Sequence, residues 1–224
     1  EGSLLPVPEN LTLLQAAALP EAMMTVYANI FMRCAFKKGE TVLVHGGTSG
    51  IGSMAIQMVK RAGASEIWTT AGSAEKCKAA ETLGATRAIN YKEEDFETVV
   101  KDGGGADVIL DMVGGDYVQK NISAARVNGR ICNIAYLNGS KVELNLIYLM
   151  VKRLILTGTT LRARPVEEKA EIRAAIEEEF WPMVAAGDIR PVIDQTFGLD
   201  EAETAQARMA KGGHIGKILL NVAV

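Results

Sequence analysis

The sequence predicts an α/β protein built on a doubly wound parallel sheet of six strands. Short segments rich in valine, isoleucine and threonine alternate with segments of helical periodicity, and this alternation repeats through residues 41–160. A glycine-rich turn joins the first strand to its helix, as in many βαβ units. Because 48% of the 224 residues are hydrophobic, the chain can cover such a sheet on both faces.

The elements of this fold are expected to follow one another in a regular order. Strands are expected at residues 41–46, 65–72, 85–91, 106–114, 129–136 and 153–160. Each of the first five is followed by an expected helix, at residues 51–62, 74–83, 93–100, 116–125 and 144–151. A further helix is expected around residues 24–27. Right-handed crossovers between parallel strands place ligands at the carboxyl ends of the strands.

The two ends of the chain are expected to belong to a second domain. The predicted elements there are a long charged helix at 165–187, a strand at 190–197, a helix that begins near Asp200 and a strand at 217–222. Pro165 suits the first turn of the long helix. The predicted organisation therefore has three segments, residues 1–21, 22–162 and 163–224.

Composition and charge argue against several classes of function. A net charge of −3 disfavours nucleic acid or an anionic membrane as a partner. No apolar run is long enough to span a bilayer, and no segment resembles a signal peptide. Cys34, Cys77 and Cys132 stand far apart, which suits a reducing cytoplasm, and with only His45 and His214 besides we expect no metal site.

The segment TVLVHGGTSGIGSMAIQMVK, which begins at Thr41, places a cluster of glycines between a strand and a helix. Glycines let the backbone approach a pyrophosphate, and a helix N-terminus offers free N–H groups and the positive end of a dipole. The spacing of Gly46, Gly50 and Gly52 is not the usual G-x-G-x-x-G, and tight packing alone could require Gly52. Within a series of βαβ units the turn favours a dinucleotide site, so we expect a Rossmann sheet.

The end of the second strand indicates which dinucleotide is bound. NAD-binding sites usually carry an acidic residue there for the ribose hydroxyls, whereas this chain has Gly72 and Ser73, with Lys76 one helical turn later. Without a carboxylate a 2′-phosphate meets no repulsion, and Ser73, Lys76 and Tyr91 offer donors and positive charge. The alternative is that Lys76 is a solvated surface lysine. We predict NADP(H) as the cofactor.

Two enzyme families carry turns of this type, and residues elsewhere distinguish them. Short-chain dehydrogenases use a Tyr-x-x-x-Lys pair with a serine upstream, and the lysine lowers the pKa of the acidic tyrosine. Tyr148 and Lys152 have that spacing, but Ala135 stands where the serine is needed. The pair also lies in an apolar predicted helix, where packing accounts for it. The sequence therefore disfavours a short-chain dehydrogenase.

A second family pattern covers the chain in order and at nearly the family's spacing, through AAALPEAMMTVYANIF, GETVLVHGGTSGIGSMAIQMVK, AGSAEKC, LGATRAINYKEEDF, ADVILDMVGGDYVQKN, GRICNIAYLNG and RPVIDQTFGLDEAETAQARMAKGGHIGKILL. On these stretches the sequence resembles the zeta-crystallin-like quinone oxidoreductase branch of the medium-chain dehydrogenases. Bacterial relatives of the p53-inducible quinone reductase look nearest. The family's A-x-x-G-x-x-G turn departs at two positions here, where it reads Gly46, Ser49 and Gly52.

The resemblance implies an enzyme that transfers hydride from NADPH to quinones or related α,β-unsaturated carbonyls without zinc. It implies a cytoplasmic homodimer joined through the sixth strand. It also implies a GroES-like catalytic domain, of which residues 1–21 would be the end and residues 163–224 the C-terminal return. The rest of that domain is expected to be absent, so weak or no activity is expected of this chain alone. A non-catalytic NADPH-binding or redox-sensing module is the alternative.

The resemblance further implies cofactor contacts at particular positions. The pyrophosphate is expected at the turn formed by Gly46, Ser49, Gly50, Ile51 and Gly52, and the 2′-phosphate at Gly72, Ser73, Lys76 and Tyr91. The adenosine and nicotinamide sides are expected to be lined by Val113, Ala135, Tyr136, Thr25 and Leu161. A C-terminal loop is expected to contribute His214 and Lys217, although a surface position accounts for His214 equally well. No catalytic side chain is expected, because the cofactor carries the reactivity and the protein positions the two rings.

Overall fold

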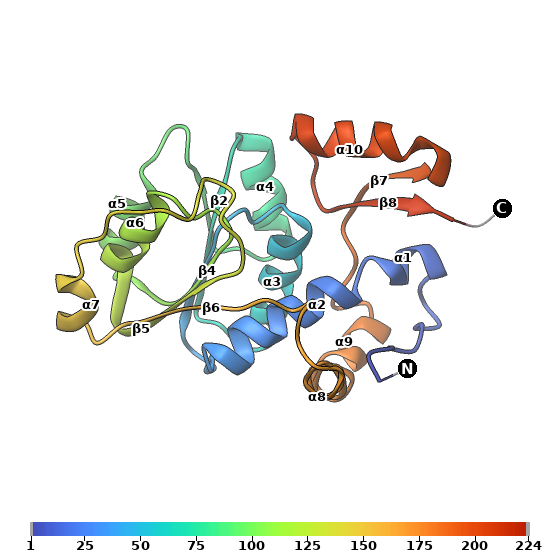
Figure 1. Cartoon of the computed structure of the whole chain (residues 1–224), viewed down its shortest axis with the longest axis horizontal. Coiled ribbons are helices and arrows are strands. Elements are labelled where there is room, and N and C mark those ends of the chain that lie inside the picture. The colour runs from blue at the N-terminus through green and yellow to red at the C-terminus, as the bar shows by residue number, and fades with distance from the viewer. Residues whose placement is uncertain (1, 223–224) are drawn as a thin grey trace.

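The structure, a computed structural model that describes residues 2–222, contains the predicted parallel sheet (Figure 1). Its strands lie in the order β3-β2-β1-β4-β5-β6, and every pairing between them is parallel. Their bounds are Thr41–Val44 (β1), Glu66–Ala71 (β2), Arg87–Asn90 (β3), Ala106–Asp111 (β4), Ala125–Asn133 (β5) and Ile155–Gly158 (β6). The order reverses between β1 and β4, which makes their carboxyl ends the topological switch point. The predicted fold class is confirmed.

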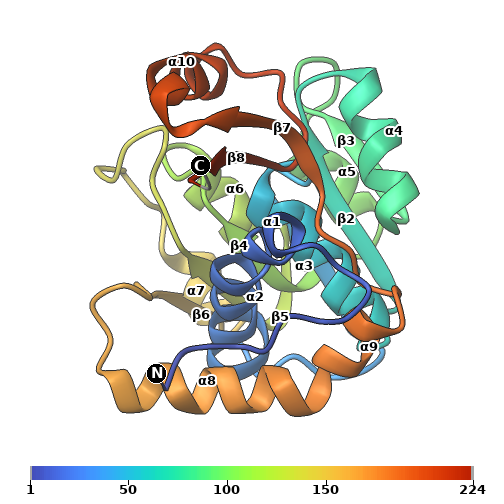
Figure 2. The same cartoon turned by 90° about the vertical axis from the view of Figure 1, so that its right-hand side faces the viewer.

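Helices cover both faces of this sheet (Figures 1 and 2). One face is covered by α2 (Pro20–Val26), the π-helix η1 (Tyr27–Arg33), α3 (Gly50–Arg61), α4 (Ala74–Leu83), α8 (Val166–Glu179) and α9 (Trp181–Ala185). The other face is covered by α5 (Phe96–Asp102), α6 (Tyr117–Ala124) and α7 (Ile147–Val151). Within the described part of the chain, no helix has both the length and the apolar character to cross a membrane.

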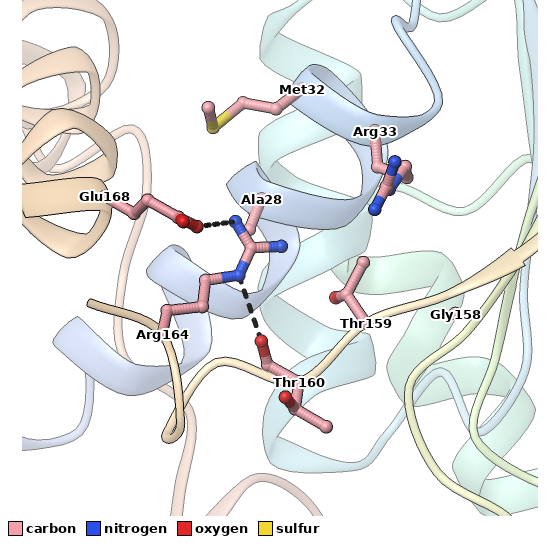
Figure 3. Close-up of a pocket in the computed structure, with 8 residues that line it drawn as sticks. All are labelled: Ala28, Met32, Arg33, Gly158, Thr159, Thr160, Arg164 and Glu168. Carbon is pink, nitrogen blue, oxygen red and sulfur yellow. Dashed lines mark hydrogen bonds and ion pairs between the residues drawn. The ribbon is translucent and has the colours of Figure 1, made fainter.

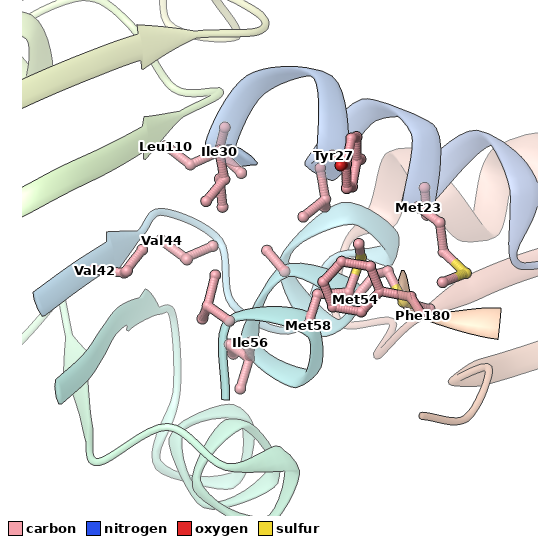
Figure 4. Close-up of a cluster of buried hydrophobic side chains, with 14 of the residues drawn as sticks. Met23, Tyr27, Ile30, Val42, Val44, Met54, Ile56, Met58, Leu110 and Phe180 are labelled. Carbon is pink, nitrogen blue, oxygen red and sulfur yellow. The ribbon is translucent and has the colours of Figure 1, made fainter. Parts of the chain in front are cut away.

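Successive side chains of the strands alternate between two buried clusters. Val42 and Val44 of β1 belong to the cluster that includes α3, whereas Leu43 belongs to the cluster that includes α6, and all three are fully buried. Figure 4 shows Val42 and Val44 beside α3 residues such as Ile56. Burial of each such side chain contributes about 1.5–3 kcal/mol, so both faces of the sheet are held by apolar packing.

A second, two-stranded parallel sheet lies at the C-terminal end of the chain. It consists of β7 (Ile193–Gly198) and β8 (Lys217–Asn221), joined by the 3-10 helix η2 (Leu199–Glu201) and by α10 (Ala202–Lys211). The short helix α1 (Leu13–Ala17) precedes α2. Just before β8, Gly216 donates its N–H to the carbonyl of Thr48 at 2.8 Å, which joins this unit to the glycine-rich turn. The division of the chain into three segments stays a prediction.

Two predicted helices begin later than expected, for local hydrogen-bonding reasons. The helix predicted at 93–100 begins at Phe96, because the Asp95 side chain caps it by accepting the Thr98 N–H at 3.2 Å. The helix predicted from residue 144 begins at Ile147, whose N–H is accepted by Asn145 at 3.1 Å. At both starts a side chain accepts a backbone N–H that has no acceptor within the helix.

The long helix predicted at residues 165–187 is two helices, α8 and α9. Phe180 ends the first, and Pro182 lies in the first turn of the second. Proline has no N–H to continue the ladder of the preceding turn, which explains the break. Pro165 is the N-cap of α8 and not a residue of its first turn. The prediction of one continuous helix was wrong.

Candidate coenzyme-binding site

Two adjoining cavities lie at the carboxyl ends of the strands. The β2-side cavity has a volume of about 440 Å³ and the β6-side cavity about 830 Å³, and Met112 and Leu137 line both. The β2-side cavity is also lined by Gly46, Thr48, Ser49, Thr70, Ala71, Gly72, Lys76, Tyr91, Val113, Tyr117, Asn138, Gly212 and His214. The β6-side cavity is also lined by Ser3, Glu21, Met24, Thr25, Asn29, Ile51, Ile134, Ala135, Thr159, Thr160, Leu161, Arg162 and Lys169.

Most of the residues predicted to contact a cofactor line one of these cavities. Those in the β2-side cavity are Gly46, Ser49, Gly72, Lys76, Tyr91, Val113 and His214. Those in the β6-side cavity are Thr25, Ile51, Ala135 and Leu161. The predicted residues that line neither cavity are Gly50, Gly52, Ser73, Tyr136 and Lys217. The two cavities adjoin at Met112 and Leu137, and the start of α3 lies between them, with Ser49 lining one and Ile51 the other.

Packing explains two of the glycines in the turn between β1 and α3. A Cβ atom on Gly52 would lie 2.2 Å from the carbonyl oxygen of Gly46, a backbone atom that cannot rotate away. A Cβ atom on Gly47 would lie 2.0 Å from Oγ1 of Thr69 on β2. Gly46 itself has a φ of +67°, in the left-handed region that glycine tolerates. The turn thus brings the start of α3 against the end of β1.

The start of α3 has two backbone donors to spare. Ser49 is its N-cap, and the serine Oγ accepts the Gly52 N–H at 2.9 Å. The N–H groups of Gly50 and Ile51 have no acceptor among the described residues. Ser49 lines one cavity and Ile51 the other, so these donors lie where the cavities adjoin. Two free amides at the positive end of a helix dipole form an anion site.

The ends of β2 and β3 form the far wall of the β2-side cavity. A Cβ on Gly72 would lie 2.5 Å from Oη of Tyr91, so the tyrosine packs directly on that backbone. Ser73 caps α4 by accepting the Lys76 N–H at 3.3 Å. No described carboxylate pairs with Lys76, which lines the cavity. Burial raises the pKa of Tyr117, on the opposite wall, to about 12, so it is a neutral phenol.

The residues after β5 divide between the two cavities and the surface. Ala135 lines the β6-side cavity. Tyr136 packs over Gly114, where an added Cβ would lie 2.7 Å from its ring, and it lines neither cavity. Leu137, which sequence reasoning missed, lines both cavities with 76% of its surface exposed. The signal available in the sequence was a leucine directly after the strand predicted at residues 129–136.

The β6-side cavity is closed by α2 and η1. Thr25 lies in it and donates its hydroxyl to Glu21 at 3.0 Å. Asn29, on the π-helix, donates its side-chain N–H to the carbonyl of Thr25 at 2.7 Å and accepts the Thr159 hydroxyl. Neither Asn29 nor the π-helix was predicted, because its turn is set by tertiary contacts with β5 and with the segment after β6. Such local widening of a helix is frequent at functional sites.

The C-terminal loop covers the glycine-rich turn from the other side. A Cβ on Gly50 would lie 2.6 Å from Cδ of Lys217, so the lysine stem lies across that glycine. The Lys217 ammonium itself pairs with Glu21 at 2.7 Å, which places its charge beside the β6-side cavity. His214 lines the β2-side cavity. The His214 ring therefore lies at the β2-side cavity, and Lys217 links this end of the chain to α2 beside the β6-side cavity.

A buried aspartate organises the wall that both cavities share. Asp111, at the end of β4, is fully buried and pairs with no lysine or arginine among the described residues. Its Oδ1 accepts the N–H groups of Val113 and Gly114 at 2.7 and 3.2 Å. Its Oδ2 accepts the side-chain N–H groups of Asn121 and Asn133 at 3.1 and 2.9 Å. Four donors thus stabilise the carboxylate and fix the turn after β4.

A buried histidine extends this network to the glycine-rich turn. His45 Nε2 lies 2.7 Å from Oδ1 of Asn121, and Nδ1 lies 3.1 Å from the Thr70 hydroxyl. The same hydroxyl accepts the Gly46 N–H at 3.2 Å, so it donates to Nδ1 and the ring carries its proton on Nε2. Burial lowers the pKa of His45, although Asp111 opposes this. These bonds give it a structural part, whereas the sequence analysis used His45 only in arguing against a metal site.

Neither a metal site nor the tyrosine–lysine alternative has support from the arrangement of side chains. Within residues 2–222, no three His, Cys, Asp or Glu side chains gather as metal ligands would. Tyr148 and Lys152 line neither cavity, and the lysine donates to the carbonyls of Ser123 and Ala125 at 2.6 and 2.9 Å. Lys152 thereby links the end of α7 to the end of α6 and the start of β5.

A third cavity, of about 490 Å³, lies beside the edge strand β6 (Figure 3). Arg164 lies across it, donates to the Thr160 carbonyl at 3.0 Å and pairs with Glu168 at 3.7 Å. Thr159 and Thr160 line both this cavity and the β6-side cavity. None of the predicted cofactor residues lines it, so we exclude it from the coenzyme site.

Comparison with known proteins gives a consistent set of relatives. The family model described as zinc-binding dehydrogenase matches residues 50–178. Human quinone oxidoreductase is 29% identical over 218 residues, which are 96% of this chain and 64% of that protein. The lovastatin diketide synthase LovF of Aspergillus terreus is 28% identical over 228 residues, 97% of this chain and 9% of the synthase. The chain thus spans less than two thirds of these relatives.

A solved structure matches the fold closely over nearly the whole chain. The quinone oxidoreductase of Thermus thermophilus, solved alone and in complex with NADPH, superposes with a TM-score of 0.87 at 27% identity. The match covers 99% of this chain and 70% of that chain.

Proposed function

Because the chain belongs to the zinc-binding dehydrogenase family, in the quinone oxidoreductase-like branch of the medium-chain dehydrogenases, we propose that it binds NADPH. In this proposal the bound NADPH transfers hydride to a quinone or a related α,β-unsaturated carbonyl. The proposal includes a cytoplasmic homodimer. Its acceptor is a small molecule, and neither nucleic acid nor a membrane is a partner in it. The observation that carries it is the pair of adjoining cavities with two free amides between them.

The described residues fit a dinucleotide laid across the two cavities. In the proposal the Gly50 and Ile51 N–H groups donate to the pyrophosphate, because they have no acceptor among the described residues. The 2′-phosphate lies beside Lys76 and Tyr91 in the β2-side cavity, with the nicotinamide in the β6-side cavity. When bound, NADPH supplies the hydride. The chain contributes position: Thr25 and Leu161 line the nicotinamide end, and Met112 closes the shared wall.

Charge in the β2-side cavity supports NADPH over NADH. No aspartate or glutamate is among its lining residues, so no described carboxylate repels a phosphate or claims a ribose hydroxyl there. Lys76 is free to pair with an added anion. This is the arrangement expected for a 2′-phosphate site, and coenzyme preference is proposed on that ground.

The lining of the β6-side cavity suits a flat, largely apolar acceptor. Its apolar members are Met24, Ile51, Met112, Ile134, Ala135, Leu137 and Leu161. The polar groups near its rim include Arg162 and Lys169, which are donors only. A quinone or an enone presents a planar apolar face and a carbonyl acceptor, which such a lining complements.

Turnover and binding measured together test this function. NADPH and benzoquinone are added to the protein, oxidation of NADPH is followed by absorbance, and NADPH affinity is measured separately by fluorescence. Binding with turnover supports the full proposal. Because weak or no activity is expected of this chain alone, binding without oxidation supports NADPH binding and does not by itself favour the non-catalytic alternative. Failure to bind NADPH would contradict both.

The homodimer is proposed from the exposed edge of β6. Within the described chain β6 pairs only with β5, and it carries apolar side chains next to α7. The exposed members of this patch are Leu146, Ile147, Tyr148, Met150, Val151 and Ile155. An open apolar strand edge favours pairing with a second copy. Sedimentation of the unaltered chain should give a dimer, and a monomer would contradict the proposal. Ile155→Lys should convert the dimer to a monomer, whereas Val166→Lys, on the exposed surface of α8, should not.

A further inference from the structure

One ring in the β2-side cavity has no partner in the protein. His214 lines that cavity together with Lys76 and Tyr91. Its Nδ1 is buried, and the described residues offer neither ring nitrogen a hydrogen-bond partner. Buried polar groups are nearly always paired, so an unpaired one at the wall of a cavity indicates a group that a ligand completes.

The loop that carries His214 is fixed on both sides. Before it, Arg208 donates to the Gly212 carbonyl at 3.1 Å. After it, the Ile215 N–H is accepted by Asp194 at 3.1 Å, and Asp194 also pairs with Arg208 of α10 at 2.9 Å. Directly after Ile215, Gly216 donates its N–H to the Thr48 carbonyl in the glycine-rich turn at 2.8 Å and forms a β-bridge with Ser49. The ring is therefore held against the cavity by groups on β7, α10 and the turn, and not by a contact of its own.

The groups around His214 keep its ring neutral in the free protein. Burial lowers its pKa, Lys76 from α4 lowers it further, Asp194 from β7 raises it, and Arg208 from α10 lowers it. Tyr91, after β3, lines the same cavity. Without a ligand, the fixed positive charge of the cavity wall is therefore that of Lys76, and the second ring proton has no acceptor.

We propose that His214 takes up a proton when the 2′-phosphate of NADPH enters this cavity and becomes the second cationic contact to it beside Lys76. The inference rests on the proposed function and names the group that sets coenzyme preference within it. A dianion beside the ring favours the imidazolium, which then donates a charge-assisted hydrogen bond. NADH carries a hydroxyl at that position and gives no such stabilisation. Preference for NADPH therefore rises as the pH falls.

Proton uptake on binding tests this directly. NADPH and NADH are titrated calorimetrically into the protein in two phosphate-free buffers of different ionisation enthalpy, between about pH 6 and 8. We expect uptake of a fraction of a proton approaching one with NADPH and none with NADH. The ratio of the NADH Kd to the NADPH Kd should grow by up to about tenfold for each unit that the pH falls. The 2′-phosphate has a pKa of about 6 and would by itself release protons on binding to cations, so net proton uptake would not come from the phosphate.

Variants separate this inference from its premise. His214→Gln should abolish proton uptake and flatten the pH dependence, whereas Lys211→Ala, exposed on α10, should leave both unchanged. If the unaltered protein binds NADPH preferentially but takes up no proton, the inference about His214 is overturned and the proposed function is not. This outcome is measured on the unaltered protein, so it holds even if the His214→Gln variant unfolds. Equal affinity for the two coenzymes overturns the phosphate assignment, and binding of neither overturns the proposed function.

Discussion

Replacing Asp111 by asparagine tests the network beneath the two cavities with the loss of a single charge. One oxygen of the new amide can still accept the two backbone N–H groups that Oδ1 accepts now. The new NH2 group would then face the NH2 groups of Asn121 and Asn133, where Oδ2 now accepts both. Three donors would meet with no acceptor between them.

Reorienting Asn121 does not relieve this conflict without further changes. Asn121 could rotate its carbonyl toward residue 111, but its Oδ1 now accepts from Nε2 of His45 at 2.7 Å. The histidine would have to change tautomer, which would move its proton to the nitrogen that accepts from Thr70. A single substitution therefore disturbs the chain of bonds from the turn after β4 to the glycine-rich turn.

The magnitude follows from the bonds lost. Hydrogen bonds to a charged group contribute about 1.5–3 kcal/mol each, and two such bonds at Oδ2 are lost. We expect Asp111→Asn to lower the free energy of unfolding by about 3–6 kcal/mol in urea titrations, and to weaken NADPH binding because the turn after β4 loosens. Asp116→Asn, exposed and nearby, should change stability by less than about 0.5 kcal/mol. A loss below about 1 kcal/mol for Asp111→Asn would refute this account of the network.

Three further variants test other parts of the account. Burial lowers the pKa of His45, so the unfolded chain binds protons first as the pH falls below about 6.5. His45 should then lower the free energy of unfolding by up to about 1.4 kcal/mol per pH unit, and His45→Gln should reduce the slope in urea titrations at several pH values, with His214, whose pKa is also lowered, contributing the remainder. Gly52→Ala, whose Cβ would lie 2.2 Å from a carbonyl oxygen, should cost about 1–3 kcal/mol of stability and abolish NADPH binding; normal affinity would show that the turn is not the phosphate site. Lys152→Met should cost about 1–3 kcal/mol, since two carbonyls lose their donor, and leave NADPH affinity unchanged; loss of binding would revive the tyrosine–lysine alternative.

The sheet was predictable because its signal is local. Val42, Leu43 and Val44 are apolar in succession, as a strand buried on both faces requires, and the same holds for the strands that follow. The ends of elements were less predictable, because single side chains decide them. Asp95 and Pro182 moved helix boundaries through one hydrogen bond gained or lost.

The candidate site was predictable where motif and position coincide. The glycine-rich turn lies at the switch point of the sheet, and Lys76 lines the cavity at the end of β2, as the sequence suggested. Gly52 shows the limit of that reasoning, since its packing contact and a phosphate role leave the same sequence signal. The network around Asp111 left none: His45 and Asn121 stand 76 residues apart and meet only in the fold.

Coenzyme titration of the Lys76→Ala variant is the most direct test of the central claim. In the account given above, Lys76 pairs with a 2′-phosphate that only NADPH carries, and Lys78, exposed on the same helix, does not. Lys76→Ala should weaken NADPH binding by about 10- to 150-fold and leave NADH binding unchanged, with Lys78→Ala altering neither. Equal affinity of the unaltered protein for both coenzymes, or an equal loss of both in Lys76→Ala, would contradict it.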